Sequence, residues 1–221
     1  MRYAEREVRQ LVRFLVWATI AFGLIVGIAR LVAIRWWTVP EGDPWLDASV
    51  APTLRGGDLV LLWHATEPTL GDLVVCPEPG APERVVVGRI AGEAGDTVRI
   101  GGSQLTRNGK PTRTERACTV SSFEVRHPKT QAKVDQLCQM EDLAGVIHPR
   151  GSASGHEAGP PEQEFKVPEG QLFLVSDNRL FPYDSRDFGT VKREACRETV
   201  FFRLVSKAGF HDVPSRLTFV R

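Results

Sequence analysis

The segment "RVVVGRIAGEAGDTVRI" (residues 84–100) has the pattern of two strands joined by a tight turn. A run of three valines leads into the pair Gly95-Asp96, and a short alternating run follows it. Two more pairs, Gly57-Asp58 and Gly71-Asp72, are followed in the same way by "LVLLW" and "LVVC". Short apolar runs punctuated by glycine turns are typical of strands. We therefore expect a β-rich core between residues 40 and 110.

The second half of the chain predicts further strands around a polar insertion. Asn108-Gly109 is a strong signal for a two-residue hairpin turn. Apolar runs predict strands at residues 171–175 and 199–206. Between about 112 and 165 the composition becomes more polar, and residues 151–164 are rich in glycine and proline. We expect an inserted subdomain over 112–165 that ends in a flexible loop over 151–164.

Residues 14–34, "FLVWATIAFGLIVGIARLVAI", form the longest apolar segment and contain one charge, Arg30. A helix of this length spans roughly 30 Å, the thickness of a bilayer core. We therefore expect a transmembrane anchor over residues 14–35. A cleaved signal peptide is the alternative, because Gly27-Ile28-Ala29 fits a small-x-small cleavage pattern. The apolar run continues beyond that point, which favours an uncleaved anchor.

Basic residues are distributed unevenly around this segment. Four arginines precede it, whereas Arg35 is the last basic residue until Arg55. The positive-inside rule then places residues 1–13 in the cytoplasm and the domain of residues 38–221 outside it. Trp36 and Trp37 follow the span, as interfacial anchors would.

Composition argues against several classes of partner. The chain has 28 Lys+Arg and 27 Asp+Glu residues, and no basic stripe interleaved with aromatic residues. We expect no nucleic-acid partner. None of the four cysteines forms a CxxC pair, so no metal site is expected. Cys118 and Cys138 flank one polar segment and are candidates for a disulfide in an exported domain, with buried free thiols as the alternative.

Three sequence blocks follow the apolar segment in a characteristic order: "SVAPTL" (49–54), "GRIAGEAGD" (88–96) and "SDNRLFPYDSRDFGTV" (176–191). Together they resemble the bacterial type I signal peptidases, or leader peptidases, from the anchor to about residue 206. The resemblance implies a mainly β, signal-peptidase-like domain with an inserted subdomain, preceded by one transmembrane helix. It also implies attachment to the inner (cytoplasmic) membrane of a bacterium, with the main domain on the periplasmic side.

In this family a serine attacks the scissile carbonyl while a neutral lysine takes its proton. Ser49 matches the nucleophile, but the lysine position is occupied by Gly88. The neighbouring Arg89 cannot act as the base because a guanidinium does not lose its proton in proteins. The first lysine of the chain is Lys110, and position 88 does not hold the histidine that related endoplasmic-reticulum enzymes use.

Two more departures concern the same chemistry. The family has a serine that supports the lysine where this chain has Pro182. Asp47 stands at the position where many relatives carry an oxyanion donor, and an ionised carboxylate there would repel the developing negative charge.

The remaining matched residues resemble the family's polar cluster near the active site. A turn stabilised by ion pairs and by hydrogen bonds of Asx side chains also explains these residues, and we favour that structural interpretation. The residues are Arg89, Asp177, Asn178, Arg179, Asp184 and Arg186.

Other groups offer weak substitutes for the base. His64 has suitable chemistry but follows a predicted strand, and its direction is open. Asp43 and Asp47 are close to Ser49 in sequence, yet a carboxylate with an ordinary pKa near ~4 is a weak base for a serine hydroxyl.

These departures favour a membrane-anchored protein that binds signal peptides of exported preproteins but has lost or impaired cleavage. The alternative is an active serine endopeptidase that uses Ser49 with an unrecognised base. A self-cleaving repressor-type protease is a third hypothesis, disfavoured by the membrane span. The expected partners are signal peptides and membrane lipid, with no cofactor and no metal.

Overall fold

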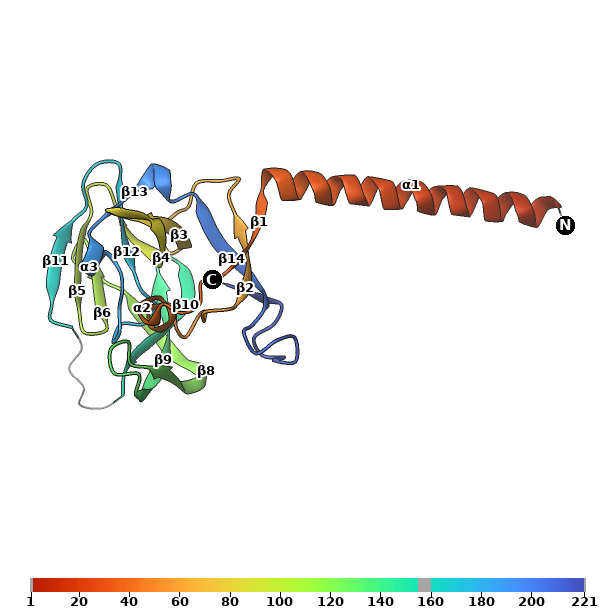
Figure 1. Cartoon of the computed structure of the whole chain (residues 1–221). Coiled ribbons are helices and arrows are strands. Elements are labelled where there is room, and N and C mark those ends of the chain that lie inside the picture. The colour runs from red at the N-terminus through yellow and green to blue at the C-terminus, as the bar shows by residue number, and fades with distance from the viewer. Residues whose placement is uncertain (1, 155–159, 221) are drawn as a thin grey trace.

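The computed structural model describes residues 2–154 and 160–220. Helix α1 (Arg2–Val32) projects alone from a β-rich body (Figure 1). Its segment Arg9–Arg30 is long and apolar enough to cross a membrane, although a signal sequence near the N-terminus passes the same test. The helix ends before the predicted limit at residue 35, because Ile34–Thr38 forms strand β1. Arg30 lies over the ring of Trp36, 4.6 Å from its centroid.

An eight-stranded sheet forms the centre of the body. Its strands follow the order β1-β2-β14-β3-β4-β12-β13, and β15 pairs with β14. The bounds after β1 are β2 (Leu59–Trp63), β14 (Glu198–Val205), β3 (Leu73–Glu78), β4 (Ala81–Glu93), β12 (Gln171–Val175), β13 (Val191–Lys192) and β15 (Thr218–Phe219).

Two smaller sheets flank this one. The first has the order β11-β5-β6-β7, with β11 (Gln163–Lys166), β5 (Thr97–Gly101), β6 (Gln104–Arg107) and β7 (Lys110–Pro111). The second has the order β10-β9-β8, with β10 (Val146–Ala153), β9 (Lys133–Leu143) and β8 (Arg113–Arg126). Three short helical segments complete the fold: α2 (Pro44–Ser49), α3 (Ser185–Phe188) and a 3-10 turn at Arg193–Ala195.

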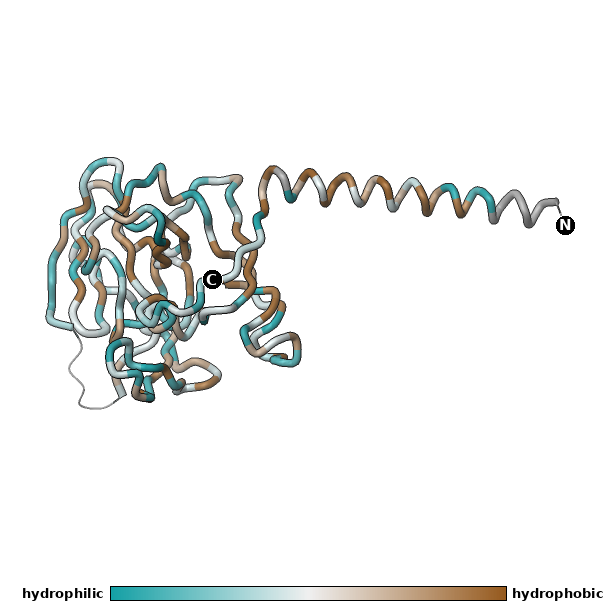
Figure 2. The backbone as a smooth tube through the Cα atoms, in the orientation of Figure 1, coloured by the Kyte–Doolittle hydropathy of each residue, from teal (hydrophilic) through white to brown (hydrophobic). Residues whose placement is uncertain are grey.

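Residues 86–92 of strand β4 are buried on both faces, which fits an apolar run there. Val87 packs in the cluster formed with β2, β3 and β14, whereas Val86 and Ile90 pack in a second cluster with β3 and β12. Figure 2 shows the corresponding apolar segments running through the interior of the body. Ala91 joins a third cluster with β5, β6 and β12, so β4 connects these three apolar clusters.

The predicted mainly β fold is confirmed, and the strands expected in the Gly-Asp pattern are present. Asn108 and Gly109 both have positive φ, 51° and 76°, as the tight hairpin turn requires. The predicted loop over 151–164 is wrong at both ends, because its first residues belong to β10 and its last to β11. Pairing with β9 and β5 holds these ends in strands, and residues 155–159 lie outside the described residues.

Two disulfides join the four cysteines. Cys118–Cys138 links β8 to β9, as the flanking positions predicted. Cys76–Cys196 links β3 to the turn before β14, a pairing that the sequence pattern did not indicate. The alternative of buried free thiols is therefore wrong in this structure.

Candidate active site

Ser49 is the last residue of the short helix α2, which the sequence pattern missed. The Asp43 side chain caps the helix by accepting from the amides of Trp45 and Leu46, and Pro44 occupies the first turn. Leu46 is buried in the main core, which anchors the helix. The region before Ser49 is therefore helical because a cap, a proline and an apolar anchor coincide.

The hydroxyl of Ser49 is fully buried. Ser49 Oγ donates to the carbonyl oxygen of Leu46 at 3.0 Å. A serine hydroxyl has one proton to donate. In this arrangement the proton is directed to a backbone carbonyl rather than to a titratable side chain.

Asn178 fixes the backbone around Ser49. Its amide N–H donates to Ser49 O at 3.0 Å, and its Nδ2 donates to Ala48 O at 2.9 Å. Its Oδ1 accepts from the amides of Leu180 and Phe181. Asn178 thus combines an Asx turn with two hydrogen bonds that hold the serine segment against the chain that follows β12.

Gly88 lies on β4 opposite Val74 of β3. A Cβ added at Gly88 would stand 3.1 Å from the carbonyl oxygen of Val175 and 3.2 Å from Leu174 Cβ. The pairing of β12 with β4 shifts register just before Leu174. The glycine therefore permits a close approach of β12, and this approach fills the space beside position 88.

The structure brings the neighbourhoods of Ser49 and Gly88 together. Their chain neighbours Val50 and Val87 pack in one apolar cluster. Strand β12 passes close to Gly88 at Val175. The chain then continues to Asn178, whose backbone N–H donates to the carbonyl oxygen of Ser49.

Arg89 and Asp177 form a buried ion pair behind this region. Arg89 Nε donates to Asp177 Oδ1 at 2.7 Å, and Nη2 donates to Oδ2 at 3.2 Å. Asp177 Oδ2 also accepts from the Thr53 hydroxyl at 2.5 Å, and Arg89 Nη1 donates to Gly71 O at 3.0 Å. Through these bonds the bidentate pair connects β4 to three segments: the one after β12, the one after α2 and the one before β3.

A second buried group extends from the first pair toward β9 and β10. Arg179 Nη2 donates to Glu141 Oε2 at 2.5 Å, and His148 Nε2 lies 3.4 Å from the same carboxylate oxygen and 3.7 Å from Asp177. Burial alone would raise the pKa of Glu141, but Arg179, His148 and Arg150 outweigh it and lower that pKa to about 2.

Burial and the charge of Arg89 lower the pKa of His148, so its ring is neutral at pH 7. Glu141 and His148 lie in the segment "MEDLAGVIHP" (140–149), to which the sequence analysis assigned no role. Their distance along the chain from Arg179 concealed the contact.

Asp184 and Arg186 stabilise the following turn. Asp184 caps α3, accepts from the Ser176 amide at 2.8 Å and pairs with Arg186 through bonds of 2.8 and 2.7 Å. Burial would raise the pKa of Asp184, yet Arg186 and the backbone donors lower it. These contacts fit the structural interpretation of the cluster.

The structure also shows the surroundings of the other two residues that depart from the family pattern, Asp47 and Pro182. Asp47 Oδ1 accepts from the amide of Gly56 at 2.7 Å, which ties the end of α2 to the next loop. Pro182 is half-buried between Phe181 and Tyr183. Neither residue supplies a proton acceptor to Ser49 through these contacts.

Of the substitute bases considered from the sequence, the Asp43 carboxylate is engaged elsewhere, and His64 follows the end of the β1–β2 pair that is remote from α2. Asp43 caps α2 and pairs with Arg84 at 3.3 Å. The His64 amide donates to Ala33 O, at the end of β2 nearest α1. The chain leaves for α2 from the opposite end of the β1–β2 pair.

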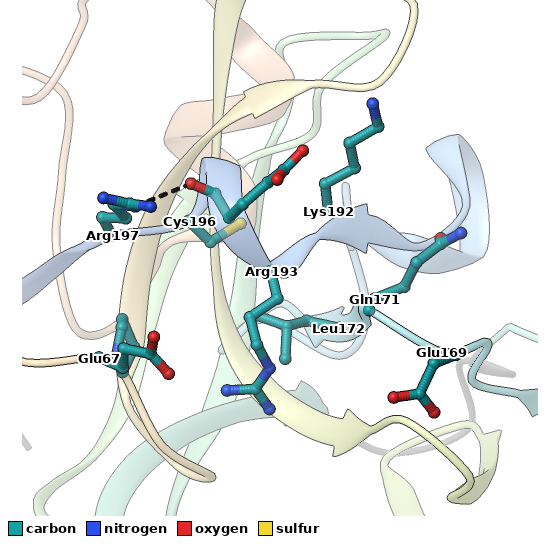
Figure 3. A pocket seen from close by; sticks show the side chains of 11 residues that line it. Glu67, Glu169, Gln171, Leu172, Lys192, Arg193, Cys196 and Arg197 are labelled. Atoms are coloured by element: carbon teal, nitrogen blue, oxygen red, sulfur yellow. Dashed lines mark hydrogen bonds between the residues drawn. The ribbon is translucent and has the colours of Figure 1, made fainter.

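A separate pocket of about 460 Å³ lies at the edge formed by β12 and β13 (Figure 3). Its lining carries charges of both signs, including Glu67, Lys192 and Arg193, and Cys196 in it is disulfide-bonded. None of the predicted site residues lines this pocket. Among the described residues no cluster of His, Cys, Asp and Glu side chains could hold a metal ion.

Comparisons with known proteins agree with the resemblance. The chain is 27% identical to signal peptidase I V of Bacillus subtilis over 52% of its length and 25% identical to signal peptidase I of Pseudomonas fluorescens over 73%. It spans only 55% and 58% of those relatives. It is 27% identical to signal peptidase I of Streptococcus pneumoniae, covering 83% of this chain and 89% of that one.

A crystal structure of a signal peptidase I from Enterococcus faecalis matches with a TM-score of 0.41 and 22% identity, covering 61% of this chain and 97% of that one. The family described as "Signal peptidase, peptidase S26" matches residues 11–205. Since this match covers most of the chain, the protein belongs to the peptidase S26 family of signal peptidases.

Proposed function

We propose that this protein binds signal peptides of exported preproteins in the manner of a signal peptidase but does not cleave them. The observation that carries the proposal is the hydrogen bond from Ser49 Oγ to Leu46 O. With Gly88 at the lysine position, no amine from β4 can accept the serine proton. Loss of one member of such a catalytic unit costs several orders of magnitude in rate.

An open strand edge supports peptide binding. Residues 81–89 of β4 pair with β3 on one side, whereas β12 covers the other side only from residue 89 onward. In the described part of the chain no strand pairs with that second side at residues 82–88. An extended peptide can add to such an edge through main-chain hydrogen bonds.

The orientation proposed for the chain follows from its basic residues. Four arginines precede the apolar segment of residues 14–34, whereas Arg35 is the last basic residue after it until Arg55, so we place the N-terminus in the cytoplasm and the β-rich body on the extracytoplasmic side of the inner membrane.

Binding is tested with the full chain in detergent micelles and a labelled signal peptide with an Ala-x-Ala site. Fluorescence anisotropy should report binding, while mass spectrometry of the same sample should report an intact peptide. The control is the same peptide with N-methylated alanines, which cannot donate to the strand edge and should bind at least tenfold more weakly. Absence of binding by the native peptide contradicts the proposed function.

The chemical cause is tested by restoring the missing groups. Gly88→Lys combined with Pro182→Ser should raise cleavage at least tenfold above that of the native chain, provided that β12 moves by a few tenths of an ångström. Gly88→Met with Pro182→Ser is the matched control, because methionine supplies a long side chain without an amine. Equal rates for the two variants would show that the missing base alone does not explain the lost turnover.

The rival function is an active endopeptidase with another base. It requires an acceptor to reach Ser49 Oγ after the bond to Leu46 O breaks, and the Asp43 carboxylate already caps α2.

A further inference from the structure

We infer that the tip of the β8–β9 hairpin, residues 122–135, is a cover that closes over Ser49 and must move before a peptide reaches this residue. The inference rests on the proposed function and adds its regulation. Ser49 is 0% exposed, and Ala48 and Ala51 beside it are 1% and 4% exposed. A peptide carbonyl cannot approach a hydroxyl buried to this extent unless a neighbouring segment moves.

The hairpin supplies part of what buries the serine segment. Val125 of β8 packs with Ala48 and Ala51, and Phe123 lies against the same cluster together with Phe181. Val125 is the only buried residue of β8, at 7% exposure, whereas most of the strand is exposed. Strand β8 therefore contacts the body mainly where it passes the serine segment.

Two ring contacts fasten the turn of the hairpin. The His127 ring lies 4.8 Å from the ring of Phe181 in an edge-on arrangement. Lys129 Nζ lies 5.9 Å from the ring centroid of Trp45, on the helix that carries Ser49. Contacts of this kind are individually weak at a surface. Ser154 Oγ adds one hydrogen bond to Asp135 O at 2.6 Å, and Phe123 lies close to Gly151 of β10, so the tip is tied to the body by a small number of contacts.

The disulfide marks where the cover begins. Cys118–Cys138 braces the two strands below the tip, and the β8–β9 register shifts between Ala117 and Ser122. Beyond this point β8 is an edge strand paired only with β9. Segments with few buried contacts open at lower free energy than the core does. The brace and the shift confine such an opening to the tip.

The test uses Ser49→Cys in the full chain. The four native cysteines form disulfides, so the new thiol is the only free one. Its rate of reaction with a maleimide measures how often position 49 is uncovered. We expect the rate to be at least a hundredfold below that of the same chain unfolded in urea.

Removing the apolar contact should open the cover. Val125→Ser added to Ser49→Cys should raise the labelling rate about tenfold. Val120→Ser is the matched control, because Val120 lies on the same strand at 70% exposure and should leave the rate unchanged. Should Val125→Ser unfold the chain, Lys129→Ala against Lys133→Ala repeats the comparison at the turn, with about a threefold increase expected for Lys129 alone.

Equal rates for the two members of both pairs would overturn the inference, as would a parent thiol that reacts as fast as in urea. The labelling uses no peptide, so its failure is distinct from a failure of peptide binding.

Discussion

Gly88 lies on β4 and Asp177 follows the end of the neighbouring strand β12, yet the two residues differ in what surrounds them. Asp177 lies among groups that satisfy its charge: a bidentate Arg89 and the Thr53 hydroxyl. At Gly88 the strand has no side chain, and β12 lies close enough to occupy the space beside it. The comparison teaches that the buried ion pairs around a serine at the nucleophile position can be present in a chain that lacks the residue types for proton transfer.

Breaking the scaffold should have the largest effect. Arg89→Met leaves the buried carboxylate of Asp177 without its ionic partner, and loss of one member of a buried pair costs about 3–5 kcal/mol. Thermal unfolding of the full chain in micelles measures the change. The control is Arg99→Met, whose ion pair with Glu164 is 54% and 52% exposed and should contribute far less to stability. Equal losses would contradict the role assigned to burial.

Acid should weaken the same scaffold at Glu141. The pKa of Glu141 falls from 4.5 to about 2 on folding, so its stabilising effect is complete above pH 4.5 and disappears as the pH falls toward 2. The difference in unfolding free energy between the native chain and Glu141→Gln should shrink by about 3 kcal/mol across this range. Glu124→Gln, at an exposed site on β8, should show no such change. A difference that is constant with pH would refute the assignment.

A substitution at Gly88 should change the free energy of unfolding least. Gly88→Ala adds a Cβ that meets the Val175 carbonyl oxygen at 3.1 Å, and overpacking of this kind costs about 1 kcal/mol. A stabilisation by a similar amount, as an unstrained glycine-to-alanine change gives, would mean that β12 does not press on position 88.

The sequence predicted the sheet strands and the family because both depend on local patterns: glycine turns, valine runs and the block at 176–191. It did not predict α2, a six-residue helix whose formation depends on the Asp43 cap and on the burial of Leu46. It also missed the contact between Glu141 and Arg179, which joins residues 38 positions apart. Ala48 and Ala51, on either side of Ser49, pack against a hairpin tip more than 70 residues away, and no local pattern encodes such packing.

The most direct measurement compares the full native chain with Ser49→Ala for cleavage of an Ala-x-Ala preprotein in proteoliposomes. Our account predicts the same background rate for both, because the Ser49 hydroxyl is bonded to the Leu46 carbonyl oxygen rather than to a base. Cleavage by the native chain that disappears in Ser49→Ala would contradict it.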